Sequence, residues 1–161
     1  MILGFHHAAL SSPDLERLKR FYCDVIGFET VYEAEWDKGA ELIDKMMGLK
    51  DVAAKVAILR TGNCFLEIFE FRSPETLPAD FWRPVHNHGM SHICIAVDDA
   101  QAEYERMSKA GMVFHCPPVH VGMPVFGTYG RDPDGNVIEV LEVRDPSFPL
   151  HFSNRVMKDK S

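Results

Sequence analysis

The stretch that decides the fold is GRDPDGNVIEVLE, residues 130–142. Pro133 presets the backbone angle φ at the second position of a type I turn, and Asp132 and Gly135 suit its first and fourth positions. The apolar, β-branched run that follows predicts a strand with Glu139 in its middle. A charge inside a strand that is otherwise fit for burial costs free energy unless it has a partner, so the chain must supply one.

An earlier stretch repeats the pattern of this strand. FLEIFEF at 65–71 aligns with VIEVLEV at 137–143, which places Glu67 on Glu139. A histidine also opens each copy, His7 in the first and His92 in the second. Such internal similarity predicts two structural units of the same kind.

Hydrophobic periodicity predicts the same order of elements, βαβββ, in both units. The predicted strands and helices of the first unit are strand 5–10, helix 13–26, and strands 28–34, 52–60 and 64–71. Those of the second are strand 91–97, helix 98–110, and strands 113–116, 125–130 and 137–143. Residues 37–50 predict a further amphipathic helix, inserted in the first unit only.

We therefore predict one α+β domain over residues 1–161. It comprises module 1 at about 5–71, a proline-bearing linker at 72–90, module 2 at about 91–143 and a C-terminal arm at 144–161.

Composition excludes several classes of protein. The formal net charge of −7 over 161 residues argues against nucleic acid and anionic membranes as partners. No apolar run reaches the roughly 18 residues needed to cross a bilayer, and residues 1–4 do not form a signal peptide. We expect a cytoplasmic protein whose 4 scattered cysteines are reduced.

The repeat predicts one candidate site. If the two modules face each other, His7, Glu67, His92 and Glu139 converge, and two imidazoles with two carboxylates suit a divalent first-row metal ion. A bound cation would also be the partner that the carboxylate in the last strand requires. The donor set does not choose among nickel, cobalt, manganese, zinc and iron, and no further cofactor is predicted.

Other polar residues are assigned less specific roles. Strand alternation predicts that His6 points to the opposite face from its neighbour. Glu70 and Glu142 lie three positions beyond the site glutamates, so we expect them on the other face as rim or solvated charges. His86 and His88 lie in the linker and are expected to be solvated.

Five segments give the chain its family resemblance. They are HAALSSPDL from His7, FYCDVIGF from Phe21, FLEIFEF from Phe65, HICIAVDD from His92 and RDPDGNVIEV from Arg131. On these segments the chain resembles the vicinal oxygen chelate superfamily, which includes glyoxalase I, methylmalonyl-CoA epimerase, extradiol dioxygenases and bleomycin-resistance proteins. The resemblance implies paired βαβββ modules that form cupped mixed sheets around a metal ion, and a homodimer.

The resemblance also implies a chemistry. In the glyoxalase and epimerase branches, the positions of His7, Glu67, His92 and Glu139 hold one divalent metal ion per site. That ion stabilises an enediolate or enolate of the substrate, and a ligand glutamate transfers the proton. We therefore expect a metal-dependent lyase or isomerase that acts on a small, partly apolar, oxygenated substrate, with Glu139 or Glu67 as the catalytic base.

Two alternatives remain open. A non-haem Fe(II) extradiol dioxygenase would use His7, His92 and Glu139, with Glu67 as an unexpected fourth ligand and Tyr129 near the site together with His120. A metal-free protein that binds a drug or an aromatic compound is the other, although such relatives usually lose the ligand set.

The substrate is not identified by the motifs. The segment after Phe65 lacks the polar residues that glyoxalase I uses for glutathione, and the turn before Glu139 lacks the lysine common in methylmalonyl-CoA epimerases. Apolar side chains are predicted to line a cleft: Phe65, Phe69, Phe71, Phe81, Trp82, Met123 and Phe126, with Met46 and Met47 as a lid.

Overall fold

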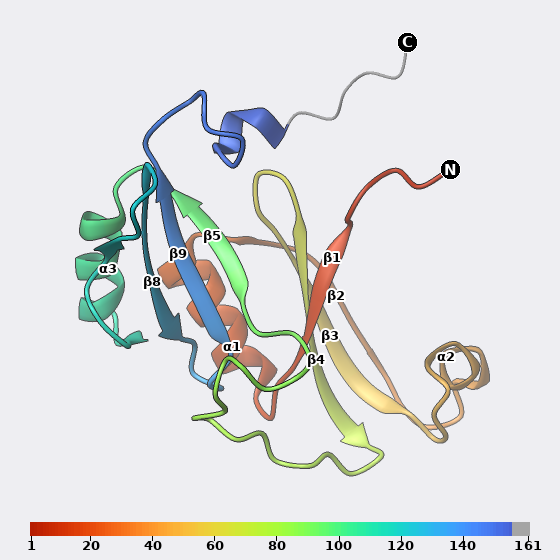
Figure 1. The fold of residues 1–161 in the computed structure, drawn as a ribbon. Helices are drawn as coiled ribbons and strands as arrows, with labels where there is room; N and C mark the ends of the chain where they lie inside the picture. The colour runs from red at the N-terminus through yellow and green to blue at the C-terminus, as the bar shows by residue number, and fades with distance from the viewer. Residues whose placement is uncertain (156–161) are drawn as a thin grey trace. The chain divides into compact units, whose positions relative to one another are not determined.

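The computed structural model describes residues 1–155, which fall into two compact units, Met1–Asp80 and Phe81 onward. Figure 1 shows that each unit contains a β-sheet and a helix that runs along it. We describe each unit by itself. Among residues 1–155, no helix combines the length and apolar character that crossing a membrane requires.

The first unit has a four-stranded mixed sheet. Its elements are β1 His7–Ser11, α1 Leu15–Arg20, a π-helical turn Phe21–Ile26, β2 Glu29–Trp36, α2 Glu41–Met47, β3 Ala53–Arg60 and β4 Phe65–Ser73. The strand order is β1-β4-β3-β2, with β1 parallel to β4 and the other pairs antiparallel. The predicted βαβββ order with one inserted helix is confirmed.

The second unit repeats this arrangement. Its elements are β5 Ile93–Val97, α3 Ala100–Lys109, β6 Val113–Phe114, β7 Val119–His120, β8 Val125–Arg131, β9 Val137–Val143 and a 3₁₀ turn Phe152–Arg155. The sheet order is β5-β9-β8-β6, and β5 is again parallel to the strand beside it. The α+β class is confirmed, whereas β7 was not predicted.

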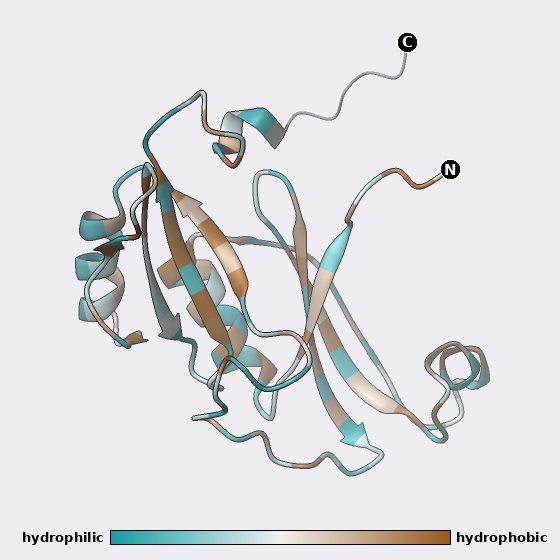
Figure 2. Cartoon of the chain, viewed as in Figure 1, coloured by the Kyte–Doolittle hydropathy of each residue, from teal (hydrophilic) through white to brown (hydrophobic). Residues whose placement is uncertain are grey.

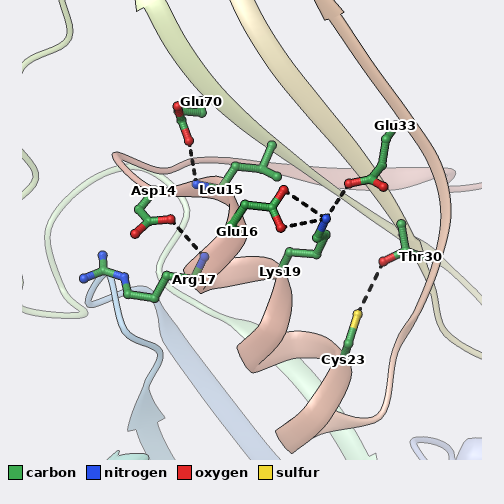
Figure 3. A network of polar contacts seen from close by, with 9 residues as sticks. All are labelled: Asp14, Leu15, Glu16, Arg17, Lys19, Cys23, Thr30, Glu33 and Glu70. Atoms are coloured by element: carbon green, nitrogen blue, oxygen red, sulfur yellow. Dashed lines mark hydrogen bonds and ion pairs between the residues drawn. The ribbon is translucent and has the colours of Figure 1, made fainter.

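Asp14 caps the N-terminus of helix α1. The Asp14 carboxylate accepts a hydrogen bond from the backbone N–H of Arg17 at 2.9 Å (Figure 3). Leu15 and Leu18 are buried against the sheet, and Gly27 ends the helical segment at φ 95°. The predicted helix 13–26 begins two residues later, at Leu15, and its second half, Phe21–Ile26, is π-helical.

The turn that precedes β9 forms as predicted. The backbone N–H of Gly135 donates to the carbonyl of Asp132 at 3.0 Å, which closes the turn. The buried Asp132 carboxylate also accepts from the backbone N–H groups of Asp134 and Asn136, each at 2.9 Å. These bonds fix the start of β9, and therefore the register of Glu139.

The two faces of strand β9 differ in burial. Ile138, Val140 and Glu142 are buried on one face, whereas Glu139 and Leu141 on the other face are partly exposed. In Figure 2 this strand is hydrophobic with hydrophilic bands, and the visible side of α3 is largely hydrophilic. The covered face forms the core, and the open face is available for a ligand.

The inserted helix α2 does not present one apolar stripe to the sheet. Leu42 and Met46 are 83% and 76% exposed, and none of its residues is buried. Ile43 and Met47 are only half-buried. The lid role expected for this helix stays a prediction.

Candidate functional site

The second unit places His92 beside Glu139. Cys94 on β5 is the cross-strand partner of Glu139 on β9, and His92 lies two residues before Cys94, so it is on the same face. The Nε2 atom of His92 is 3.1 Å from Oε2 of Glu139, and the two side chains are 30% and 20% exposed. His92 precedes β5 by one residue, whereas the sequence predicts it inside the strand.

The first unit contains the same arrangement. Ala9 on β1 is the cross-strand partner of Glu67 on β4, and His7 lies two residues before Ala9. The Nε2 atom of His7 is 3.3 Å from Oε2 of Glu67, with side-chain exposures of 39% and 18%. The two units therefore present one histidine and one glutamate in identical register.

Each histidine is also held through its other ring nitrogen. Nδ1 of His92 lies 2.8 Å from the Ser91 hydroxyl, and Nδ1 of His7 lies 2.8 Å from Nδ1 of His6. The expectation that His6 faces away is wrong, because this residue precedes β1, where strand alternation does not apply. Its ring stacks on Phe65 instead.

The donor chemistry of both pairs fits a divalent metal ion. A ligand histidine typically binds the metal ion through one nitrogen while the other is oriented by a hydrogen bond, and each Nε2 here faces a carboxylate. Each unit by itself supplies one such pair. Within residues 1–155, no group of three or more histidine, cysteine, aspartate or glutamate side chains forms a ready metal cluster.

The two pairs differ in the residue opposite the glutamate. Tyr129 on β8 is the cross-strand partner of Glu139, whereas Ile58 on β3 is the partner of Glu67. The Tyr129 side chain lies beside Glu139, and the centroids of the Tyr129 and His92 rings are 5.2 Å apart. Burial, with the Glu139 charge as a further cause, raises the pKa of Tyr129.

The sequence treats Tyr129 as a minor candidate only. Its place depends on the three-residue loop 133–135, because Asp132 pairs with Asn136 and this register sets position 129 opposite position 139. His120, its suggested companion, is exposed on β7 and packs against Phe126.

Glu142 corrects a sequence prediction. It is 5% exposed, so it is not a solvated rim charge. Its carboxylate accepts from the backbone N–H of Ala100 at 3.0 Å and pairs with the Arg144 guanidinium. Glu70 accepts in the same way from Leu15 at 2.9 Å (Figure 3). Both carboxylates face a helix N-terminus, where they satisfy an N–H that has no partner within the helix.

The remaining histidines have ordinary surroundings. His86 and His88 are exposed, in agreement with the expectation that they are solvated. His151 lies in the C-terminal arm, where its Nδ1 is 2.7 Å from the Ser153 hydroxyl.

The predicted aromatic wall is partly correct. Phe65, Phe69 and Phe71 alternate along β4, on the face that carries Glu67. Phe69 stacks on Phe71 and contacts Trp36, which the sequence analysis missed. On β8 and β9, in contrast, Phe126 is the cross-strand partner of Glu142, so it faces away from Glu139. The Phe126 assignment is therefore wrong.

A cleft of about 700 Å³ lies within the second unit. Ala96, Leu141 and Val143 contribute from the sheet, and Leu150, His151 and Phe152 contribute from the arm. Predicted lining residues such as Met123 are not among the side chains that form it.

Comparison with protein families gives one match over most of the chain. Residues 4–140 match the model of the family described as Glyoxalase/Bleomycin resistance protein/Dioxygenase superfamily. The matched range contains both histidine–glutamate pairs and ends just before the arm.

Two characterised relatives are similar over most of their length. The chain is 30% identical over 151 residues to 2-epi-5-epi-valiolone epimerase from Actinomyces sp, covering 88% of this chain and 80% of that protein. It is 28% identical over 138 residues to lactoylglutathione lyase from Haemophilus influenzae, covering 84% and 90%. One relative is therefore an epimerase and the other a lyase.

Among solved structures, a glyoxalase family protein from Bacillus cereus has the same fold. The TM-score is 0.79 at 21% identity, and the match covers 88% of this chain and 95% of that chain. At this identity the likeness concerns the fold alone.

Proposed function

Because the chain belongs to the glyoxalase/bleomycin resistance protein/dioxygenase superfamily, we propose that it is a divalent-metal-dependent lyase or isomerase. Its substrate would be a small, partly apolar molecule with neighbouring oxygen atoms. The observation that carries the proposal is the pair of matched contacts, His7 with Glu67 and His92 with Glu139, in identical register. Structural charge pairs of this kind would not need the same register in both units.

In this proposal, His7, Glu67, His92 and Glu139 hold one divalent ion. When bound, the ion supplies a Lewis acid that polarises a substrate carbonyl and so makes the adjacent C–H bond more acidic. The Ser91 hydroxyl lies 2.8 Å from Nδ1 of His92, and Tyr129 lies opposite Glu139 on the neighbouring strand. Such supporting contacts keep ligand side chains in one orientation.

A carboxylate then moves the proton. The side chains of Glu67 and Glu139 are 18% and 20% exposed, so substrate can reach either of them. Glu139 or Glu67 takes the proton beside the carbonyl. For an isomerase that inverts this carbon, a proton must then return to the opposite face, and the other glutamate would donate it. The name of the epimerase relative supports proton transfer by a carboxylate. An epimerase inverts a stereocentre, and a proton transfer of this kind achieves the inversion.

The alternatives have less support. A ring-cleaving iron dioxygenase typically uses two histidines, one carboxylate and open coordination positions. Glu67 lies as close to a histidine as Glu139 does, and this equivalence favours a set of four ligands. A metal-free binding protein would not require either pair.

The test combines metal analysis with proton exchange. Protein purified anaerobically, without chelators or a polyhistidine tag, should contain nickel, cobalt, manganese or zinc near one ion per chain. With that ion, 2-oxo and 2-hydroxy compounds should exchange the proton beside the carbonyl for solvent deuterium, followed by NMR.

Three variants make the test specific. Two of them, Glu139→Gln and Glu67→Gln, each remove one candidate base. The variant that removes the true base should reduce exchange by about 10²-fold or more. Glu105→Gln, an exposed substitution on α3, is the matched control and should leave exchange unchanged. Air-sensitive iron together with cleavage of catechols would instead identify the dioxygenase, and failure to bind any divalent metal would exclude both enzymes.

We also propose that the protein is a cytoplasmic homodimer with the module boundaries given above. Light scattering of the purified protein tests the dimer, because a mass of 18.3 kDa would identify a monomer.

A further inference from the structure

The cleft of the second unit lies at one end of its sheet, under the C-terminal arm. Ala96 of β5 and Leu141 and Val143 of β9 form its floor, and Leu150 and Phe152 of the arm form a wall. Figure 1 shows the arm turning back over the carboxyl ends of these two strands. The volume of about 700 Å³ is in the range of sites for small molecules.

The floor of the cleft continues the face that carries the candidate centre. Glu139, Leu141 and Val143 alternate on one face of β9, and the last two line the cleft. At about 3.3 Å per residue along a strand, they lie roughly 7 and 13 Å beyond the glutamate. A substrate held at Glu139 that extends toward the carboxyl end of β9 therefore enters the cleft.

The charges around the cleft are balanced locally. The guanidinium of Arg144 pairs with Glu142, and that of Arg106 lies 2.6 Å from Glu103. Both arginines are thus engaged by carboxylates that line the cleft. Asp98 also lines the cleft, so the lining has three carboxylates and one guanidinium, and a phosphate or carboxylate group of a ligand would meet a net negative charge.

The remaining polar atoms suit hydroxyl groups. The carboxylate oxygens of Asp98 accept hydrogen bonds, and the imidazole of His151 accepts or donates. Leu150, Phe152 and Leu141 provide apolar contact beside them. This combination matches a ligand with hydroxyl groups along one edge and an apolar face.

We propose that this cleft binds the remote part of the substrate and selects neutral, hydroxyl-bearing groups over anionic ones. The inference rests on the proposed function for the reaction, but the selection itself is a binding property. The arm lies outside residues 4–140, where the family match is found.

The experiment compares two probes that differ in one charged group, an inositol monoketone and its monophosphate ester. Calorimetry on the metal-loaded full chain measures binding, and NMR measures deuterium exchange beside the ketone. The neutral probe should bind about tenfold or more tightly than the ester. Phe152→Ser and Leu150→Ser, both in exposed positions, should weaken binding of the neutral probe about tenfold. They should raise KM and leave kcat within about twofold of the wild-type value.

A charge reversal tests the selection directly. Asp98→Lys should narrow the preference for the neutral probe by about tenfold, because it adds a cation to the cleft. Glu105→Lys changes the net charge equally but does not line the cleft, so it should leave the preference unaltered.

The outcomes separate the two proposals. Tight binding of the neutral probe without deuterium exchange would exclude the proposed reaction. It would still support the proposed selectivity of the cleft. A preference for the ester, no binding of the neutral probe, or arm variants that bind like the wild type would overturn the inference about the cleft.

Discussion

The carboxylate of Glu142 on β9 accepts a hydrogen bond from the backbone N–H of Ala100, the first residue of α3, at 3.0 Å. The other unit repeats the contact between Glu70 on β4 and Leu15 at 2.9 Å. A glutamate three positions beyond each site glutamate thus ties its strand to the helix behind the sheet. One strand therefore carries two carboxylates on opposite faces, one that bonds to a helix and one that belongs to the candidate site.

Glu142→Gln should destabilise the protein by about 1–3 kcal/mol. The change weakens a charge-assisted hydrogen bond to the helix and the pairing with Arg144, at a position only 5% exposed. Urea unfolding at neutral pH measures the loss. The control Glu105→Gln should stay within about 0.5 kcal/mol of wild type, and an equally small effect at position 142 would contradict the structural role.

The same residue predicts a pH dependence. The hydrogen bond from Arg144, and also that from Ala100, lowers the pKa of Glu142. Its stabilising contribution is therefore complete above the unfolded value of about 4.3 and is lost as the pH falls through the lower folded value. The stability gap between wild type and Glu142→Gln should shrink when urea unfolding is repeated from pH 5 down to pH 3. A gap that widens toward acid would show that the sign is wrong.

Tyr129→Phe should weaken metal binding without unfolding the protein. It removes the hydroxyl of the residue opposite Glu139 but keeps the ring that packs against His92. Loss of such a supporting contact typically costs about 10–100-fold in metal affinity, which competition with a chromophoric chelator measures. Tyr32→Phe, at a site 56% exposed, is the matched control. Equal affinities for the two variants would remove Tyr129 from the site.

Gly135→Ala should destabilise the turn that sets the register of β9. The residue has φ +87°, and an added Cβ would lie 2.6 Å from Cα of Phe81. We expect a loss of more than about 1 kcal/mol, whereas Gly62→Ala, which has open space around it, should be neutral or stabilising by up to about 1 kcal/mol. Thermal unfolding of both variants compares them, and equal melting temperatures would show that the turn does not need glycine.

Local patterns were sufficient to predict most of the fold. The turn around Asp132, the cap at Asp14 and the period-2 pattern of β9 depend on contacts within a few residues, which is why they can be recognised without a structure. The repeat then identified His7 and His92 as equivalent positions, because two copies of one pattern fold alike. The predicted strand 113–116 is present as the shorter β6, and β7 was missed, since two-residue strands have no periodicity.

Contacts between distant segments needed the tertiary structure. Glu142 looks like a surface charge in sequence and is buried only because α3 begins beside it. Tyr129 lies opposite Glu139 because of the register of β8 against β9. The wall that Leu150 and Phe152 build over the sheet is fixed by how the arm turns back, which no periodic pattern encodes. The sequence by itself determined the elements, their order and the paired donors, since these depend on local propensity. The tertiary structure decided which neighbours each donor has, because packing joins residues far apart in the chain.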